Sequence, residues 1–275
     1  TDDRFTNSEK ATIFDDMTST IMSRVENFRL YQDNEACFKY SKFLSETNWT
    51  RLKHVANHYL TFMRNNEFDA SCDIGEKAPV IRSETFKRYL ELRQNAKYLF
   101  IAEGLGYQGG HFSGIAITSE RILLGNHPDV DQKSVLGEWD YAKTRTSDPN
   151  SPLLNNSQKQ KGFNEPTDTA VWNALNRHGL AAFDVILWNI FPFHPYKEGN
   201  LLSNRTPTNA ELDEGIEYAK MLMELVPGME VVAIGQKAAN TLKNYGVDCK
   251  PVPHPSMGGA NRFKAAVAEI FANEK

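Results

Sequence analysis

The stretch Lys97–Gly106, KYLFIAEGLG, decides the fold class of this chain. Its apolar run Lys97–Ala102 has the length and composition of a strand buried on both faces, as in a parallel sheet. A carboxylate and a glycine-rich turn follow directly. Three later apolar runs have the same character, the last of them more weakly, and we expect strands there: Phe183–Asn189, Glu230–Gly235 and Cys249–Pro253.

Helical patterns lie between these runs. Thr208 and Glu211 have the spacing of a capping box, which marks a helix start. Gln236–Tyr245 and Asn261–Asn273 are shorter amphipathic segments. Strands that alternate with helices indicate a parallel sheet covered on both faces. We therefore predict an α/β fold, a three-layer αβα sandwich around a central four-stranded, mainly parallel sheet.

The first 95 residues have a different character, and we expect a helical N-terminal extension packed on the core. Apolar residues recur at helical spacing over 13–28 and 49–63. Ser83 is a candidate N-cap for a third helix, and Asp69–Pro79 has the composition of a loop. Residues 96–275 then form the α/β domain. Within it, the polar stretch 121–166 is predicted to be an insertion, either a lid or DNA-contacting element, or a solvated decoration.

Composition places the chain among ordinary globular proteins. It has 275 residues, 40% of them hydrophobic and 24% charged, with no apolar run long enough to span a bilayer. The polar start of the chain does not resemble a signal peptide, so we expect a cytoplasmic location. The net charge of −4 argues against bulk electrostatic coating of nucleic acid but allows a few local phosphate contacts.

Three polar side chains follow the ends of predicted strands. Glu103 ends the first strand, Asn189 ends the second, and His254 follows the fourth. Ligands of open parallel sheets bind beyond the carboxyl ends of the strands. A carboxylate, an amide and an imidazole at one such edge predict a catalytic site.

Three segments around these residues resemble the uracil-DNA glycosylase superfamily. AEGLGYQGGHFSGIAITSE is similar to the family's first glycine-rich motif, LWNIFPFHP to its mid-chain Asn segment, and HPSMGG to its closing His-Pro-Ser motif. The resemblance runs from Tyr98 to about Phe271. Each segment alone is weak, but the three occur in the family's order, each at a predicted strand end.

The resemblance implies a role for each of the three residues. Glu103 would activate water toward the anomeric carbon and stabilise an oxocarbenium-like sugar. Asn189 would read the base edge, because its amide offers both a donor and an acceptor. His254 would donate a hydrogen bond to the base oxygen as negative charge develops there.

Further residues would contact DNA. The resemblance places Ser256, Gly258 and Gly259 near a phosphate and lets Met257 wedge into the duplex as the nucleotide leaves. The predicted DNA-binding set also includes two arginines, Arg262 and Arg205.

Three polar residues allow two interpretations each. Arg205 could pair with a phosphate or with a carboxylate. Glu120 is a reserve acid/base candidate that could instead cap a helix or pair with Arg121. His194 could belong to the site or be structural.

The chain departs from the family at the base pocket. Ala116-Ile117 stands where the family has Pro-Phe, so Ile117 offers no aromatic face to the base, and Phe112 or Tyr107 could substitute. Gly106 stands where the strictest uracil enzymes carry a Tyr gate, which removes a block against groups on C5 of a pyrimidine. The cysteines depart as well. Family branches with this first motif often hold an iron–sulfur cluster, whereas this chain has only three cysteines and no C-x-x-C pair.

We therefore expect a monofunctional DNA glycosylase that flips out a modified or damaged pyrimidine and leaves an abasic site, with uracil as the default substrate. A bulky C5-modified cytosine, such as glucosylated hydroxymethylcytosine of phage DNA, is the alternative and would imply antiviral defence rather than DNA repair. A non-catalytic module that binds DNA lesions and an unrelated α/β nucleosidase or hydrolase remain open. The expected partner is DNA, duplex or single-stranded, with no metal, cofactor or membrane, and the expected state is a monomer.

Overall fold

A computed structural model describes residues 71–176 and 182–272 of the chain. Both helices expected over 13–28 and 49–63 lie outside the described residues. The strands are β1 (Tyr98–Gly104), β2 (Val185–Phe191), β3 (Glu230–Ile234) and β4 (Lys250–Val252). The longer helices are α4 (Ala78–Glu91), α8 (Pro166–Asn176), α9 (Asn209–Leu225), α10 (Gln236–Asn244) and α11 (Ala260–Ala272). The short turns of helix are η2 (Tyr107–His111), α5 (Glu120–Leu123), α6 (Lys133–Leu136), η3 (Tyr141–Lys143) and α7 (Asn156–Lys161).

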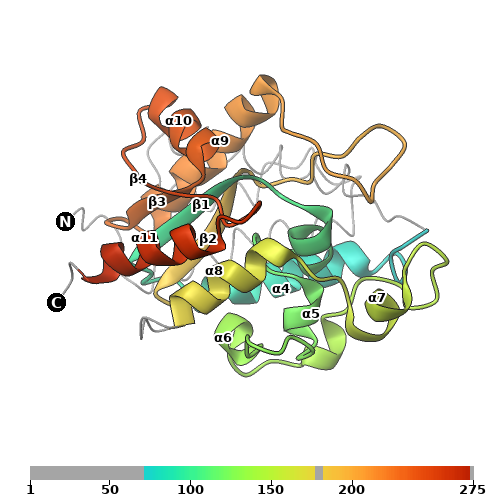
Figure 1. Ribbon diagram of the computed structural model, residues 1–275. Coiled ribbons are helices and arrows are strands. Elements are labelled where there is room, and N and C mark those ends of the chain that lie inside the picture. The colour runs from blue at the N-terminus through green and yellow to red at the C-terminus, as the bar shows by residue number, and fades with distance from the viewer. Residues whose placement is uncertain (1–70, 177–181, 273–275) are drawn as a thin grey trace, which may run out of the picture.

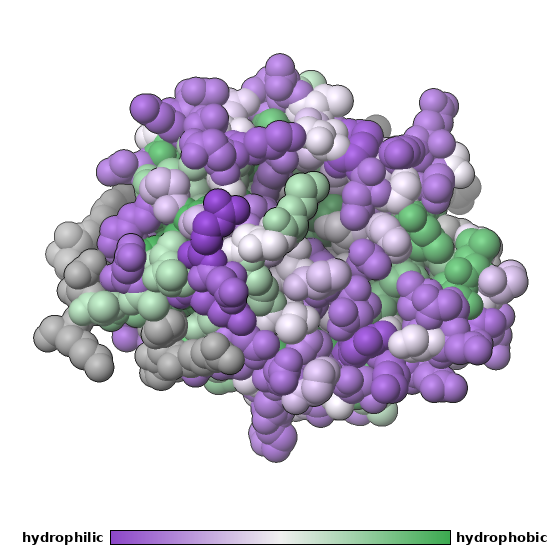
Figure 2. All heavy atoms as spheres, viewed as in Figure 1, coloured by the Kyte–Doolittle hydropathy of each residue, from purple (hydrophilic) through white to green (hydrophobic). Residues whose placement is uncertain are grey.

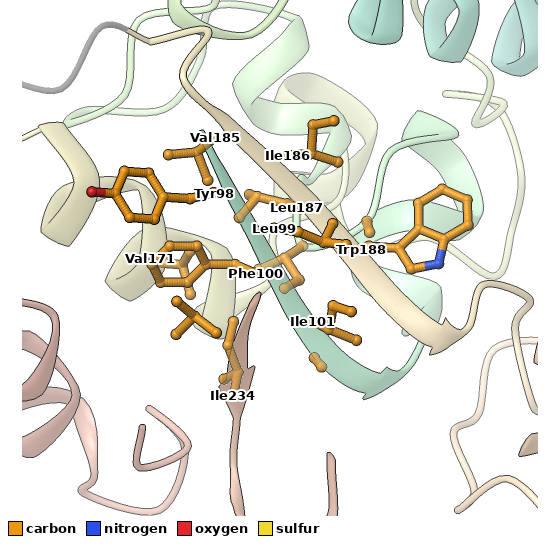
Figure 3. Close-up of a cluster of buried hydrophobic side chains, with 14 of the residues drawn as sticks. Tyr98, Leu99, Phe100, Ile101, Val171, Val185, Ile186, Leu187, Trp188 and Ile234 are labelled. Carbon is orange, nitrogen blue, oxygen red and sulfur yellow. The ribbon is translucent and has the colours of Figure 1, made fainter. Parts of the chain in front are cut away.

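All four strands run parallel, in the order β2-β1-β3-β4. Helices α9 and α10 cover one face of the sheet, and α8 and α11 cover the other (Figure 1). Side chains alternate between these layers, so Phe100 lies with Val171 of α8 on one side and Trp188 lies on the other (Figure 3). The predicted three-layer α/β sandwich is confirmed.

Helix α4 protects the outer edge of β2, where backbone groups have no neighbouring strand. Leu187 N donates to the hydroxyl of Tyr89 over 2.7 Å, and Arg93 Nε donates to Val185 O over 2.9 Å. Arg93 is fully buried, and its guanidinium makes four further hydrogen bonds to backbone carbonyls. Covering an edge in this way satisfies the strand and prevents pairing with other chains.

Two local expectations fail next to this helix. Helix α4 begins at Ala78, five residues before Ser83, and has a proline in its first turn, a position that proline tolerates well. Ser83 is therefore not the N-cap; its hydroxyl donates to the carbonyl of Pro79 one turn earlier. The expected loop Asp69–Pro79 is correspondingly shorter, since its last two residues are helical.

The insertion 121–166 is folded rather than structureless. The carboxylate of Glu120, which has no exposed surface, accepts hydrogen bonds from Thr146 N, from Ser147 N and Oγ, and from Phe163 N, over 2.8, 2.9, 2.5 and 3.4 Å respectively. This one carboxylate therefore ties two distant parts of the insertion to α5. The visible face is mostly hydrophilic, with a hydrophobic patch beside α7 at the right (Figure 2). Leu153, in the loop before α7, is 56% exposed.

Candidate active site

The carboxyl edge of the sheet carries all three predicted active-site residues. Glu103 is the penultimate residue of β1, Asn189 lies near the end of β2, and His254 follows β4 by two residues. The turn between β3 and α10 links two of them. A Cβ placed on Gly235 would lie 3.2 Å from Cβ of His254, and Lys237 Nζ lies 3.8 Å from Glu103 Oε2. Glu103 and His254 therefore border the same turn.

Glu103 and Asn189 approach this edge from opposite faces of the sheet. Ala102 is the register partner of Asn189, so these two side chains share a face. Glu103 is one residue further and points to the α10 side, as its contact with Lys237 shows. A base lying across the ends of β1 and β2 would have the amide on one side and the carboxylate on the other.

Asn189 is almost completely buried, with 2% of its surface exposed. Its side chain makes no hydrogen bond to the residues that the structure describes. Burial of an amide is favourable only when its donor and its acceptor find partners. Its free donor and acceptor suit a ligand that offers both complementary groups.

His254 is held in one tautomer by its own loop. The backbone N–H of Ser256 donates to Nδ1 over 3.1 Å, and the Ser256 hydroxyl lies 2.7 Å from the same nitrogen. Because an N–H group can only donate, Nδ1 is the acceptor and the neutral ring carries its proton on Nε2. Partial burial lowers the pKa of His254 below its ordinary value. The imidazole is therefore a neutral donor through Nε2–H.

The loop that follows His254 is tightly built and ends in an exposed tip. A Cβ on Gly259 would lie 2.1 Å from the carbonyl oxygen of His254, so only glycine fits there. Met257 has φ 51° and is fully exposed, which is unusual for a large apolar residue. Ser256 is exposed beside it, but its contact in this structure is with His254 rather than with a phosphate.

The loop after β1 packs against two later segments. Asn204 Oδ1 accepts from Tyr107 N over 3.0 Å and lies 3.2 Å from His194 Nε2. His194 Nε2 also contacts Ser203 O at 2.7 Å, so this nitrogen is the donor and His194 braces the loop. Gly106 is extended, with φ −97° and ψ 147°, a conformation open to any residue.

The remaining predicted base contacts lie deeper. Phe112 has no exposed surface and stacks on Phe163 with centroids 4.2 Å apart, in a small core of its own. Ile117 is 3% exposed, has φ 50°, and its carbonyl accepts from Trp172 Nε1. Tyr107 is half-buried and contacts both Phe163 and His194. Of these three side chains, Tyr107 has the most open surroundings.

The other candidates divide between surface and scaffold. Arg205 pairs with the carboxylate of Glu211 through two nitrogens, over 2.7 and 2.6 Å, so its partner is a carboxylate. Arg262 is exposed on the first turn of α11. Glu120 is saturated by donors from the insertion and is structural in this geometry, and Arg121 pairs elsewhere.

Sequence reasoning missed Glu165, which lies against the same glycine loop. Its Oε2 is buried without a partner and would lie 1.8 Å from a Cβ on Gly109. Burial raises the pKa of Glu165 to about 8, with a smaller contribution from Asp168. The sequence signal was the position of Glu165 just before a helix-starting proline, in Asn164-Glu165-Pro166, and nothing in the sequence linked it to Gly109, 56 residues earlier.

Metal ligation has no support in the part of the chain that the structure describes. No three of its His, Cys, Asp or Glu side chains lie close enough together to hold an ion. Among the described residues, Cys249 is a free thiol. Across residues 71–176 and 182–272, no helix is both long and apolar enough to cross a membrane.

The architecture is that of an open α/β domain with its candidate site at the carboxyl ends of parallel strands. A family model described as the uracil DNA glycosylase superfamily matches residues 150–273. Residues 150–273 are therefore similar to a domain of this superfamily, whose general activity class is that of a DNA glycosylase. The matched range contains Asn189 and His254 but not Glu103. No curated protein matches the chain.

Proposed function

We propose that this protein is a monofunctional DNA glycosylase that everts a modified or damaged pyrimidine and hydrolyses its N-glycosidic bond. Uracil is the default substrate. The observation that carries the proposal is the tautomer of His254, which Ser256 N–H holds with a proton on Nε2. A neutral Nε2–H at that position can donate a hydrogen bond to the negative charge that develops on the base oxygen, and it keeps its proton while doing so.

The three side chains divide the reaction between them. Asn189 binds the base edge with its free amide, and Glu103 accepts a hydrogen bond from a water held near C1′. As the bond from C1′ to N1 breaks, its electron pair stays on the base and spreads to O2, where His254 Nε2–H donates to it. The water oxygen bonds to C1′ and its proton passes to Glu103, which leaves an abasic site and the base anion; the anion takes up a proton from solvent to become the free base.

Met257 fits the eversion step. A fully exposed apolar side chain at the tip of the loop after His254 can enter the space that the nucleotide leaves. The backbone N–H of Gly258 would lie close to the adjacent phosphate, because no atom lies within 4 Å of a Cβ placed on this residue. The N–H of Gly259 instead donates to Ser256 O over 3.0 Å, so Gly259 shapes the loop.

Single-turnover base release on a duplex with one uracil, detected by alkaline strand cleavage, tests this proposal. We expect release by the wild-type protein and a large loss in Glu103→Gln. Asp213→Asn, which changes an exposed carboxylate on α9, is the matched control and should keep the wild-type rate. Binding of abasic or mismatched duplex without release of any base would favour the non-catalytic module instead.

A second substrate class, pyrimidines modified at C5, is favoured by Gly106. Its backbone conformation does not require glycine, and a Cβ there would meet nothing closer than 3.7 Å. The missing side chain therefore leaves room beside the base. A glycosylase for a bulky C5-modified cytosine of phage DNA would act in antiviral defence rather than in DNA repair.

A further inference from the structure

The chemistry of the pyrimidine ring fixes which part of the site faces C5, and this step rests on the proposed function. C2 and C5 lie opposite each other across the ring. If His254 donates to O2, a group on C5 points away from His254, past β1 and toward the β2 side of the sheet. The segments there are the loop after β1, which contains Gly106, and the loop between β2 and α9, which contains Asn204.

Two polar side chains meet at Gly106. A Cβ on Gly106 would lie 3.7 Å from Asn204 Nδ2 and 3.8 Å from Glu165 Oε1. The carboxyl of Glu165 also fills the space that a side chain on Gly109 would occupy. The space that Gly106 leaves open is therefore lined by an amide and a carboxyl rather than by an apolar wall.

Both side chains have unused hydrogen-bonding capacity. Asn204 uses Oδ1 for Tyr107 N and His194 Nε2, and its Nδ2 donates to none of the described residues. Glu165 makes no hydrogen bond to the described residues either, and its Oε2 is shut off from solvent. An unpartnered buried oxygen such as Glu165 Oε2 calls for an explanation, and a ligand group supplies one. Asn204 is exposed, so its Nδ2 is open to a ligand from solvent.

The charge of this pair follows from burial. Desolvation raises the pKa of Glu165 to about 8, so at neutral pH its carboxyl is mostly protonated. It then offers one O–H donor together with acceptor lone pairs, and Asn204 adds an N–H donor. A hydroxyl group, which both donates and accepts, complements this set.

We propose that Glu165 and Asn204 form a subsite for a hydroxyl-bearing substituent on C5 of the everted pyrimidine, such as a hydroxymethyl group. The subsite selects such a base over thymine, whose methyl group can bond to neither polar side chain and would leave the buried Oε2 of Glu165 without a partner. A site that hydrogen-bonds a substrate hydroxyl rejects an analogue without this hydroxyl more strongly than an apolar pocket rejects an analogue that differs by one methylene group.

Single-turnover release from matched duplexes that carry uracil, thymine or 5-hydroxymethyluracil tests the subsite. We expect the wild type to release 5-hydroxymethyluracil at least about tenfold faster than thymine. Glu165→Leu and Asn204→Ala should each lower the ratio of the 5-hydroxymethyluracil rate to the uracil rate by about tenfold. Glu165→Gln retains a neutral donor and acceptor and should keep the ratio within about threefold. Glu198→Gln, on an exposed residue of the loop that contains Asn204, is the control and should keep the wild-type ratio.

Two results overturn the proposal: a wild type that does not prefer 5-hydroxymethyluracil to thymine, or variants at Glu165 and Asn204 that keep the wild-type ratio. If the wild type releases no base at all, the proposed function fails, and fluorescence anisotropy on the same duplexes then decides about the subsite. A binding preference for 5-hydroxymethyluracil over thymine that Glu165→Leu abolishes supports it. Equal binding of the two duplexes overturns it.

Discussion

Replacement of Gly106 by tyrosine tests whether this position faces C5 of the base. The backbone there has φ −97° and ψ 147°, which any residue adopts, and the nearest atoms to a new Cβ lie 3.7–3.9 Å away, at ordinary contact distance. Loss of glycine also reduces the conformational entropy of the unfolded chain, which stabilises the folded protein by about 0.4–1 kcal/mol. The free energy of unfolding should therefore change by no more than about 1 kcal/mol in either direction.

The effect on substrate choice should be much larger. A phenol ring at residue 106 would fill the space beside Asn204 and Glu165, and exclusion of one methyl-sized group is worth about 1–3 kcal/mol. We expect release of 5-hydroxymethyluracil to fall about 10- to 200-fold relative to release of uracil. Single-turnover assays on the two duplexes, together with urea unfolding curves, measure both quantities.

Gly109 provides the contrasting control for this experiment. A Cβ there would lie 1.8 Å from Glu165 Oε2, so Gly109→Ala should destabilise the protein by about 1–3 kcal/mol through overpacking. If Gly106→Tyr folds normally and still releases both bases in the wild-type ratio, Gly106 does not face C5 and the assigned orientation of the base is wrong.

Three further changes probe the site and its scaffold. Glu103→Gln should slow base release about 10²- to 10⁴-fold while duplex affinity in fluorescence anisotropy stays the same, and a near wild-type rate would remove Glu103 from the mechanism. His254→Ala should cost about 2–4 kcal/mol of transition-state stabilisation, measured from single-turnover rates, and a loss below threefold would contradict its donor role. Arg205 lowers the pKa of Glu211 to about 2, below its ordinary 4.5, so this pair stabilises the protein above about pH 4.5 and the contribution disappears as pH falls toward 2. Unfolding curves of Glu211→Gln should show about 1 kcal/mol less stability at pH 7 and a weaker acid dependence, whereas an unchanged acid limb would mean that solvent screens the pair.

The sheet was predictable because its strands carry their own signal. Each of the four apolar runs lies within two residues of an observed strand. The first three strands are buried along most of their length, and such a strand must be apolar throughout. Strand β4 has two exposed residues out of three, which agrees with its weaker signal. The start of α9 was equally clear: Thr208 and Glu211 form the predicted capping box. These features depend on residues that are close in sequence.

The failures depend on contacts between distant residues. Helix α8 was not predicted, although its start is marked by Pro166 after Asn164 and Glu165. The polar composition of the insertion left open whether it is a lid, a DNA-contacting element or a solvated decoration, and it did not reveal that the buried carboxylate of Glu120 organises the segment through partners 26 to 43 residues away. No local pattern in the sequence reveals such a contact.

In the candidate site, too, the residues with a local sequence signal were predicted and those that depend on distant contacts were not. The sequence located Glu103, Asn189 and His254 because each follows or ends a strand, and the family model covers the last two. It did not locate Glu165, whose position against Gly109 arises only when α8 packs beside the loop after β1. The pairing of Arg205 with Glu211 is visible only in the structure, since a phosphate was an equally good partner on sequence grounds.

Detection of the free base by liquid chromatography and mass spectrometry tests the central claim most directly. Duplexes with one uracil would be incubated with the wild type and with Glu103→Gln, Asn189→Ala and His254→Ala. We predict stoichiometric uracil and an equal amount of abasic strand from the wild type, and a strongly reduced yield over the same time from all three variants. No free base from the wild type, or wild-type yields from all three variants, would contradict the claim that these groups act together on one everted nucleotide.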